Sequence, residues 1–163
     1  MLIRPTTYAD IPVLLAIFYY ARQQMIWDGN PDQWGDNYPS REQLEEDIRR
    51  GVSYVIERDG GVVASFVFVQ GEDPTYSLIE DGAWLNDLPY GTIHRIASSG
   101  KIKGVFGVVL DWCTAHCANI RIDTHQDNSR MLHLVEKHGF TRCGIIYTRD
   151  HSPRIAFQRY YNS

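Results

Sequence analysis

The stretch 93-IHRIASSGKIKGVFGVVLDWC-113 determines the architecture, because it reads as a strand, a glycine-rich turn and a helix in direct succession. Residues 90–98 form a β-rich run, and the apolar pattern that follows predicts a helix over 104–117. A turn of this kind presents unpaired N–H groups at the positive end of a helix dipole, which is a favourable place for an anion. We therefore expect the turn to bind phosphate, with Lys101 and Lys103 adding charge-assisted hydrogen bonds.

Two familiar phosphate-binding loops do not fit this turn. A Walker A loop has the order G-x-x-x-x-G-K-[ST], whereas the lysines here precede the later glycines. A dinucleotide fingerprint has the spacing G-x-G-x-x-G, whereas Gly100, Gly104 and Gly107 are spaced G-x-x-x-G-x-x-G. The alternative to a binding loop is a plain strand-to-helix turn with solvated lysines.

The elements around this stretch predict a single α/β or α+β domain over residues 1–163, built on a central mixed sheet. Thr7 and Asp10 resemble a capping box that opens a helix, and Asp59-Gly60-Gly61 marks a hairpin. The expected helices are 11–25, 41–50, 104–117 and 128–138, and the expected strands are 2–4, the hairpin 52–71, 90–98, 119–125, 140–148 and 154–161. Residues 72–88 read as an acidic, irregular segment.

Composition narrows the class of protein. The net charge of −4 and the pI near 5.8 argue against a nucleic-acid partner, which normally meets a basic surface. No uninterrupted apolar run is long enough to cross a membrane, and the first residues lack the apolar core of a signal peptide. The three cysteines, Cys113, Cys117 and Cys143, are expected to be reduced thiols. These features predict a cytoplasmic protein.

Three ordered motifs in the second half of the chain resemble the GNAT-type N-acetyltransferases. They are the opening stretch, IRIDTHQDN at 120–128 and MLHLVEKHGF at 131–140. The resemblance implies an acetyl-CoA-dependent enzyme with a twisted, mostly antiparallel sheet of about six to seven strands and about four helices. It also implies that the family's loop pattern [QR]-x-x-G-x-[GA], which binds the pyrophosphate, becomes Lys101-x-x-Gly104-x-Phe106 here. Phe106 departs from that pattern, because the family has a small residue at this place.

The same resemblance implies the remaining contacts with acetyl-CoA. The backbone of Ile96 would pair with a pantetheine amide as an added strand. Asn128 matches the family's asparagine that contacts the pantetheine arm, although a plain helix cap explains it equally well. The implied cofactor-binding residues are Ile96, Ala97, Ser98, Lys101, Ile102, Lys103, Gly104, Val105, Phe106 and Asn128.

Amine acetylation needs a base, because a lysine-like amine is neutral in only about one molecule in 2,500 at pH 7. The resemblance implies Asp123 as the base, and His94 on the cofactor strand is an equal candidate because histidine is a common general base near neutral pH. The family's acid tyrosine corresponds to Val135, so Tyr147 or His133 would have to replace it. Histidine and carboxylate spacings give no zinc-type pattern, and no metal is expected.

The resemblance implies that the N-terminal helices and the loops before the cofactor strand form the acceptor pocket. Its expected aromatic residues are Trp27, Trp34, Tyr38, Tyr76 and Trp84. Carboxylates at Glu72, Asp73, Glu80 and Asp81 could attract an amine, or could form an ordinary solvated surface. A small primary amine or a peptide amine is compatible with these residues.

Two further alternatives stay open at this stage. The absent tyrosine at Val135 and the bulky Phe106 also suit a non-catalytic acyl-CoA-binding regulatory module of the same fold. Pairing between the C-terminal strands of two copies would give a homodimer, whereas a covered strand at 154–161 would not.

Overall fold

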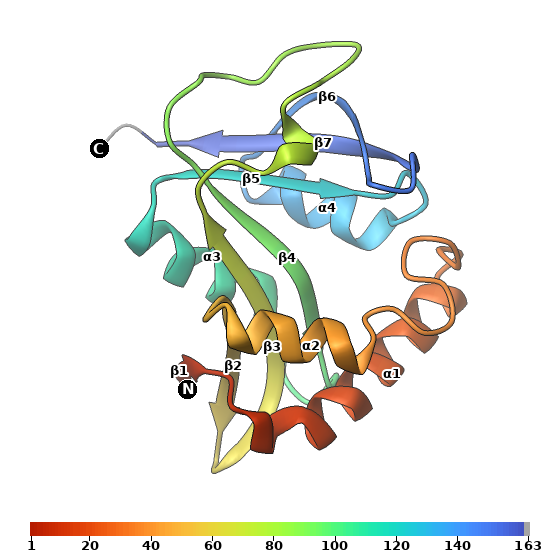
Figure 1. The fold of residues 1–163 in the computed structure, drawn as a ribbon, viewed down its shortest axis with the longest axis vertical. Helices are drawn as coiled ribbons and strands as arrows, with labels where there is room; N and C mark the ends of the chain where they lie inside the picture. Colours follow the sequence, from red (N-terminus) through yellow and green to blue (C-terminus); the bar gives the residue numbers. More distant parts are fainter. Residues whose placement is uncertain (162–163) are drawn as a thin grey trace. The chain divides into compact units, whose positions relative to one another are not determined.

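The computed structural model describes residues 1–161, which contain seven strands and four α-helices (Figure 1). The elements are β1 (Leu2–Pro5), α1 (Ile11–Trp27), α2 (Arg41–Arg49), β2 (Ser53–Arg58), β3 (Gly61–Gln70), β4 (Gly91–Ser98), α3 (Val105–His116), β5 (Asn119–Thr124), α4 (Ser129–Lys137), β6 (Thr141–Tyr147) and β7 (Pro153–Tyr160). The strands follow the order β1-β2-β3-β4-β5-β7-β6 in one sheet. The ladder between β4 and β5 is parallel, and those of β1 with β2, β2 with β3, β5 with β7 and β6 with β7 are antiparallel. The predicted fold class is confirmed.

Backbone contacts divide the chain into two compact units. Unit 1 consists of Met1–Phe68 and His94–Val109, and unit 2 consists of Val69–Ile93 and the residues from Leu110 onward. Each unit contributes its own group of candidate site residues, so the two are described in turn.

The N-terminal hairpin of unit 1 forms where the sequence predicts it. Asp59 and Gly60 both have positive φ values, 53° and 81°, and they join β2 to β3 with Arg58 opposite Gly61. Positive φ at both central residues is the geometry of a type I′ turn, whose twist matches that of the flanking strands. This explains why Asp-Gly at this place gives a hairpin.

The core of unit 1 lies where α1 and α2 pack on the sheet. Its buried members are Leu14, Ile17, Phe18, Leu44, Val55 and Ala97. On α1, Ile17 and Phe18 follow Leu14 by three and four residues, so one face of that helix is apolar. Ala97 brings β4 into this core, which fixes the strand that leads to the glycine-rich turn.

The start of α1 is held by an ion pair. Arg4 donates to both oxygens of Asp10, at 2.8 and 2.9 Å, and the Thr7 backbone N–H donates to Asp10 Oδ2 at 2.7 Å. The hydrogen bonds from Arg4 lower the pKa of Asp10 to about 2. The predicted interaction between Thr7 and Asp10 is therefore present, and Arg4 reinforces it.

Unit 2 is built on β5, β7 and β6. β7 pairs with β5 from Asn119↔Tyr160 to Thr124↔Ile155, and with β6 from Thr141↔Gln158 to Tyr147↔Pro153. Because β7 has a partner on each side, it has no open edge for a second copy. Of the two alternatives for residues 154–161, the structure shows the covered strand, and the homodimer stays a prediction.

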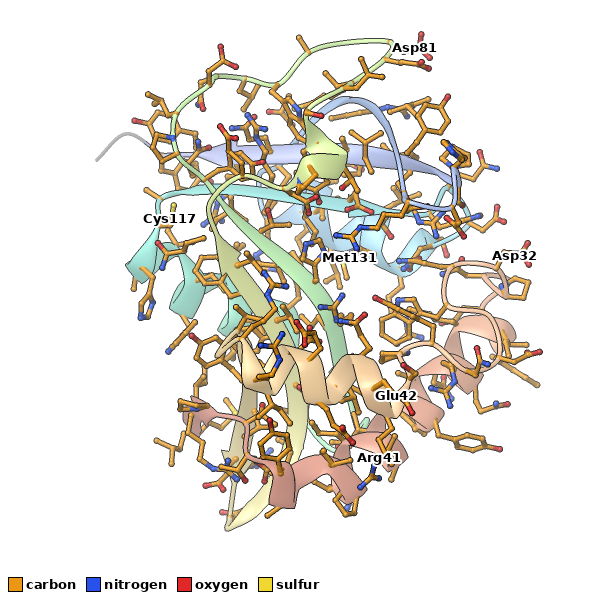
Figure 2. All side chains as sticks on the ribbon, in the orientation of Figure 1. Asp32, Arg41, Glu42, Asp81, Cys117 and Met131 are labelled. Atoms are coloured by element: carbon orange, nitrogen blue, oxygen red, sulfur yellow. The ribbon has the colours of Figure 1, made fainter. Side chains whose placement is uncertain are left out.

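The segment between β3 and β4 is irregular, as predicted. It contains one short 3-10 helix, η2 (Pro74–Tyr76), and touches the edge strand β6 through an isolated bridge between Glu80 and Ile145. Gly82 lies so close to β6 that a Cβ there would collide with the carbonyl oxygen of Cys143. Figure 2 shows Asp81 at the tip of this segment with its side chain directed outward, and Asp81 is exposed.

A buried amide network ties the end of this segment to β5 and β7. Gln158, which is 0% exposed, donates to Asn119 Oδ1 at 2.7 Å and accepts from the Leu85 backbone N–H at 2.9 Å. Asn119 in turn donates to Asn86 Oδ1 at 2.9 Å. Buried amides satisfied in this way fix the path of the loop. Among residues 1–161, no helix has the length and apolar character that crossing a membrane requires.

Candidate functional site

The glycine-rich turn joins β4 to α3 within unit 1. The Gly100 backbone N–H donates to Ser98 Oγ at 3.1 Å, and the Lys101 N–H donates to Ser99 Oγ at 3.2 Å. The Ser99 N–H donates to the Val63 carbonyl oxygen at 2.9 Å, which anchors the start of the turn on β3. The side chains of Ser98 and Ser99 therefore hold the first part of the turn. The second part of the turn continues from there into α3.

Two glycines of the turn have left-handed backbone conformations for different reasons. Gly100 has a φ of 82°, and a Cβ there would lie 2.6 Å from the Tyr20 hydroxyl oxygen. Gly104 has a φ of 73°, but no atom lies within 4 Å of the place of its missing Cβ. Gly100 thus permits close packing on α1, whereas Gly104 leaves open space directly before the first residue of α3. Such a space, next to a helix N-terminus, suits an anionic ligand.

The side chains of the turn separate into exposed basic and buried apolar groups. Lys101 and Lys103 are exposed, whereas Ile102 is 9% exposed and Val105 is 8% exposed. Phe106 is 4% exposed, so its ring belongs to the core. The ring of Phe106 is therefore not exposed on the surface of the turn.

β4 contains an unusual residue just before the predicted cofactor positions. Arg95 has a φ of 48°, which is rare for a side chain with a Cβ. Its guanidinium donates to Asp47 at 2.8 and 2.7 Å and to the Tyr38 hydroxyl at 2.9 Å. Three hydrogen bonds from one buried side chain thus hold the strand in this conformation.

The remaining residues of β4 follow directly after Arg95. Ile96 and Ser98 are partly buried and Ala97 is 3% exposed. The parallel ladder with β5 covers only Gly91↔Ile120 and Thr92↔Arg121, so in the described chain it ends before Ile96. β-augmentation by an amide-bearing ligand requires a strand edge without a ladder, such as this edge of β4 beyond Thr92. His94, the second candidate base, is partly buried on the same strand.

Unit 1 brings together two of the three aromatic residues expected from its helices and loop. Trp34 lies between Phe18 and Tyr38, with ring centroids 5.6 and 6.4 Å away. Trp27, at the end of α1, is 86% exposed. The structure therefore groups Trp34 with Tyr38 and leaves Trp27 on the surface.

Asp123 in unit 2 meets a buried tyrosine. The Tyr76 hydroxyl donates to Asp123 Oδ2 at 2.6 Å, and Tyr76 is 1% exposed. Burial, together with the neighbouring carboxylate, raises the pKa of Tyr76 well above its ordinary value. Tyr76 was expected to line the acceptor pocket, but its place in the core instead makes it the hydrogen-bond partner of the candidate base.

Trp84 packs on the same tyrosine. Its ring centroid lies 5.1 Å from that of Tyr76, and its indole N–H donates to the Tyr76 carbonyl oxygen at 2.9 Å. Trp84 is partly buried, so part of its side chain is accessible to solvent. The structure therefore brings Tyr76, Trp84 and Asp123 together in unit 2.

One of the proposed substitutes for the acid tyrosine, Tyr147, lies on the other face of the sheet from Asp123. The register puts Asp123, Ala156 and Gly144 on one face of the sheet, so Tyr147 points to the opposite face. The Tyr147 hydroxyl donates to Glu80 Oε2 at 3.0 Å, which raises the pKa of Tyr147. His133 is exposed on α4.

Two positions on or beside α4 have a clear structural role. Val135, which stands where the family has a tyrosine, is 0% exposed. Asn128 Oδ1 accepts from the Met131 backbone N–H at 3.0 Å, so Asn128 caps α4. A helix cap was one of the two interpretations of this residue. Within residues 1–161, no group of three or more metal-ligating side chains could hold a metal ion.

Solved structures provide the comparison with known proteins. A GNAT-family acetyltransferase from Streptococcus agalactiae is 28% identical, with a TM-score of 0.88 over 99% of this chain and 96% of that one. The chain has the GNAT fold and resembles that family.

Two further structures share the fold at 18% identity. They are a GNAT-family acetyltransferase from Listeria monocytogenes, with a TM-score of 0.70 over 98% of this chain and 94% of that one, and a ribosomal-protein-alanine N-acetyltransferase from Brucella melitensis, with a TM-score of 0.62 over 99% and 100%. No protein-family model matches the sequence, and no curated protein matches it.

Sequence reasoning missed two arginines of this chain. Arg121 is 5% exposed and lies between the rings of Trp84 and Tyr90, with its Cζ atom 4.1 and 3.9 Å from their centroids. The alternation Ile120-Arg-Ile-Asp already placed it on the same face of β5 as Asp123. Arg95 had no such signal, because Asp47 and Tyr38 are remote in sequence.

Proposed function

We propose that the chain is an N-acetyltransferase of one domain, residues 1–163, that transfers the acetyl group of acetyl-CoA to a primary amine of a small molecule or peptide. The likeness over nearly the whole chain to the Streptococcus agalactiae acetyltransferase carries this proposal. The free, unpaired cysteines agree with action in the cytoplasm.

The turn after β4 supports binding of coenzyme A. The open space at Gly104, the start of the twelve-residue helix α3 and the exposed Lys101 and Lys103 together suit a pyrophosphate. Backbone amides from Ile102 to Phe106 would bind the phosphates, and Ile96, Ala97 and Ser98 would meet the pantetheine arm. Asn128, whose side-chain oxygen caps α4, would also contact that arm.

The reaction would proceed by direct attack in a ternary complex. Bound acetyl-CoA supplies a thioester, whose carbonyl carbon forms a bond to the amine nitrogen while its bond to sulfur breaks. Deprotonating a lysine-like amine at pH 7 costs ~4.6 kcal/mol, so a base that accepts this proton matters most. Asp123 and His94 are the proposed bases. A buried Val135 cannot donate a proton, and a thiol with a pKa near 8.5 needs only ~2 kcal/mol of help.

The acceptor would be an amine that meets aromatic and acidic side chains. Trp34 and Tyr38 in unit 1 and Trp84 in unit 2 are the aromatic candidates that pack into ordered clusters. Exposed carboxylates such as Glu72 and Asp81 would attract a cationic amine before its deprotonation.

The proposed cofactor site is tested by adding a carboxylate at Gly104. Gly104→Glu should weaken acetyl-CoA binding roughly tenfold or more, because the new side chain would occupy the open space and repel phosphate. Gly51→Glu is the matched control, since Gly51 also has a positive φ, 69°, and open space beside it. Equal acetyl-CoA affinities for the two variants, measured by calorimetry, would show that acetyl-CoA does not bind at this turn.

The proposed bases are separated by single substitutions. Asp123→Asn or His94→Ala should lower kcat by ~10²–10⁴ for the true base, with little change in acetyl-CoA binding. If either substitution lowers the rate only in proportion to a loss of acetyl-CoA affinity, that residue would instead have a binding role.

The buried Val135 also favours a second candidate function. A chain that binds acetyl-CoA without a proton donor at this position would suit a regulatory module of the same fold. That function predicts acetyl-CoA binding and no thiol release with any amine.

A further inference from the structure

We propose that Tyr76 is a positioning residue for catalysis, which orients the Asp123 carboxylate so that its second oxygen accepts the proton of the amine. This inference rests on the proposed function and deepens it. It starts from the 2.6 Å hydrogen bond between the Tyr76 hydroxyl and Asp123 Oδ2. A neutral donor bonded to a carboxylate forms a short, charge-assisted hydrogen bond, and this one joins η2 to β5.

The tyrosine ring is fixed by its surroundings. Tyr76 is 1% exposed and packs with Tyr90, Ile146 and Ala156 in one buried cluster. Its carbonyl oxygen is bonded to the indole of Trp84. A ring held on several sides cannot turn its hydroxyl away from Asp123, so the hydrogen bond also fixes the rotamer of the carboxylate.

The start of η2 adds to this rigidity. The Asp73 side chain accepts from the Thr75 backbone N–H at 2.9 Å, and the Tyr90 hydroxyl accepts from the Asp73 N–H at 2.8 Å. The backbone that carries Tyr76 is therefore itself anchored to the cluster.

One oxygen of Asp123 remains for chemistry. In the described chain, the Tyr76 hydroxyl is the only hydrogen-bond partner of this carboxylate, and it engages Oδ2. Asp123 is only partly buried, and Oδ1 is not among the sealed polar atoms. Oδ1 is therefore open to water or to an amine, while Oδ2 is held.

The neighbouring cation does not compete for Asp123. Arg121 lies on the same face of β5, but its guanidinium donates to the Asn86 carbonyl oxygen at 2.8 Å and stacks between Trp84 and Tyr90. Asp123 consequently meets a neutral donor and not a cation. The raised pKa of Tyr76 keeps this donor protonated at neutral pH.

The test compares two buried tyrosines of the same cluster. Tyr76→Phe should lower kcat roughly tenfold to a hundredfold with little change in KM, because a misplaced base loses the near-attack geometry. Tyr90→Phe removes a hydroxyl that bonds to the Asp73 backbone N–H and not to Asp123, so it should lower kcat much less than Tyr76→Phe does. Melting temperatures show whether each variant is folded.

A double-mutant cycle distinguishes positioning from general damage. In the Asp123→Asn background, Tyr76→Phe should cause no further loss of kcat, since the two residues act as one unit. Additive losses, or equal losses for Tyr76→Phe and Tyr90→Phe, would overturn the inference and leave the proposed function standing. The inference would also be overturned if Asp123→Asn had the same kcat as the wild type. A folded wild-type protein that acetylates no amine would remove the proposed function itself.

Discussion

The ion pair between Asp47 and Arg95 gives the sharpest prediction about stability. Asp47 on α2 is 1% exposed, and both of its oxygens accept from Arg95, at 2.8 and 2.7 Å. The Arg95 side chain is 13% exposed. Asp47→Ala would remove two of the three hydrogen bonds described above for the Arg95 guanidinium. The bond to the Tyr38 hydroxyl would remain. An uncompensated buried charge is among the most destabilising changes a single substitution can make.

The expected magnitude follows from this burial. Removing one partner of a buried pair costs about 3–5 kcal/mol, which for a chain of this length lowers Tm by roughly 6–20 °C. Arg95→Ala should cost a similar amount. The double variant should lose less than the sum of the two, because no charge remains buried without its partner.

Thermal and urea unfolding, followed by circular dichroism, would measure the stability of the wild type, the two single variants and the double variant. Glu46→Ala is the matched control, because Glu46 on the same helix forms an equally short pair with Arg49, at 2.6 Å, but both side chains are exposed. The control should show no measurable loss of stability. Losses in Asp47→Ala that are as small as those of the control, or strictly additive losses in the double variant, would refute the reasoning.

Two further predictions concern the start of α1 and the loop on β6. Asp10→Asn should destabilise the protein near neutral pH. Because folding lowers the pKa of Asp10 from 3.8 to about 2, this stabilisation is complete above pH ~4 and disappears as the pH falls toward 2. Urea unfolding at pH 6, 4 and 3 should therefore show a shrinking difference from the wild type, and a constant difference would contradict the assignment. Gly82→Ala should destabilise by roughly 1–3 kcal/mol, because its Cβ would collide with backbone of β6. Gly61→Ala, whose Cβ would meet a carbonyl oxygen at 3.9 Å, is its control in thermal melts, and equal Tm values would show that the loop does not lie on β6 as described.

Local features of the sequence predicted most elements because each depends on a few adjacent residues. The Ser40 side chain accepts from the Gln43 backbone N–H at 3.1 Å, as a helix cap should, and Asp59-Gly60 makes the predicted turn. The sequence order of strands and helices followed from these signals. The position of β7 between β5 and β6 did not, because strand order depends on contacts that no local pattern encodes.

The candidate site was predictable only in part for the same reason. The sequence predicted the glycine-rich turn between strand and helix, and the structure shows that its Gly100 and Gly104 have left-handed backbone. The hydrogen bond from Tyr76 to Asp123 joins residues 47 positions apart, and the pair of Arg95 with Asp47 joins residues 48 apart. Neither partner carries a spacing signal that points to the other, so only the folded chain reveals them.

The measurement that tests the central claim most directly combines acetyl-CoA binding with turnover on one sample. Calorimetric titration would measure binding, and release of free thiol would be followed against a panel of small amines and peptide amines. The account predicts saturable binding that Gly104→Glu weakens and Gly51→Glu does not, and thiol release with at least one amine. Absence of acetyl-CoA binding by the folded wild-type protein would contradict the account, and binding without release across the panel would favour the regulatory function.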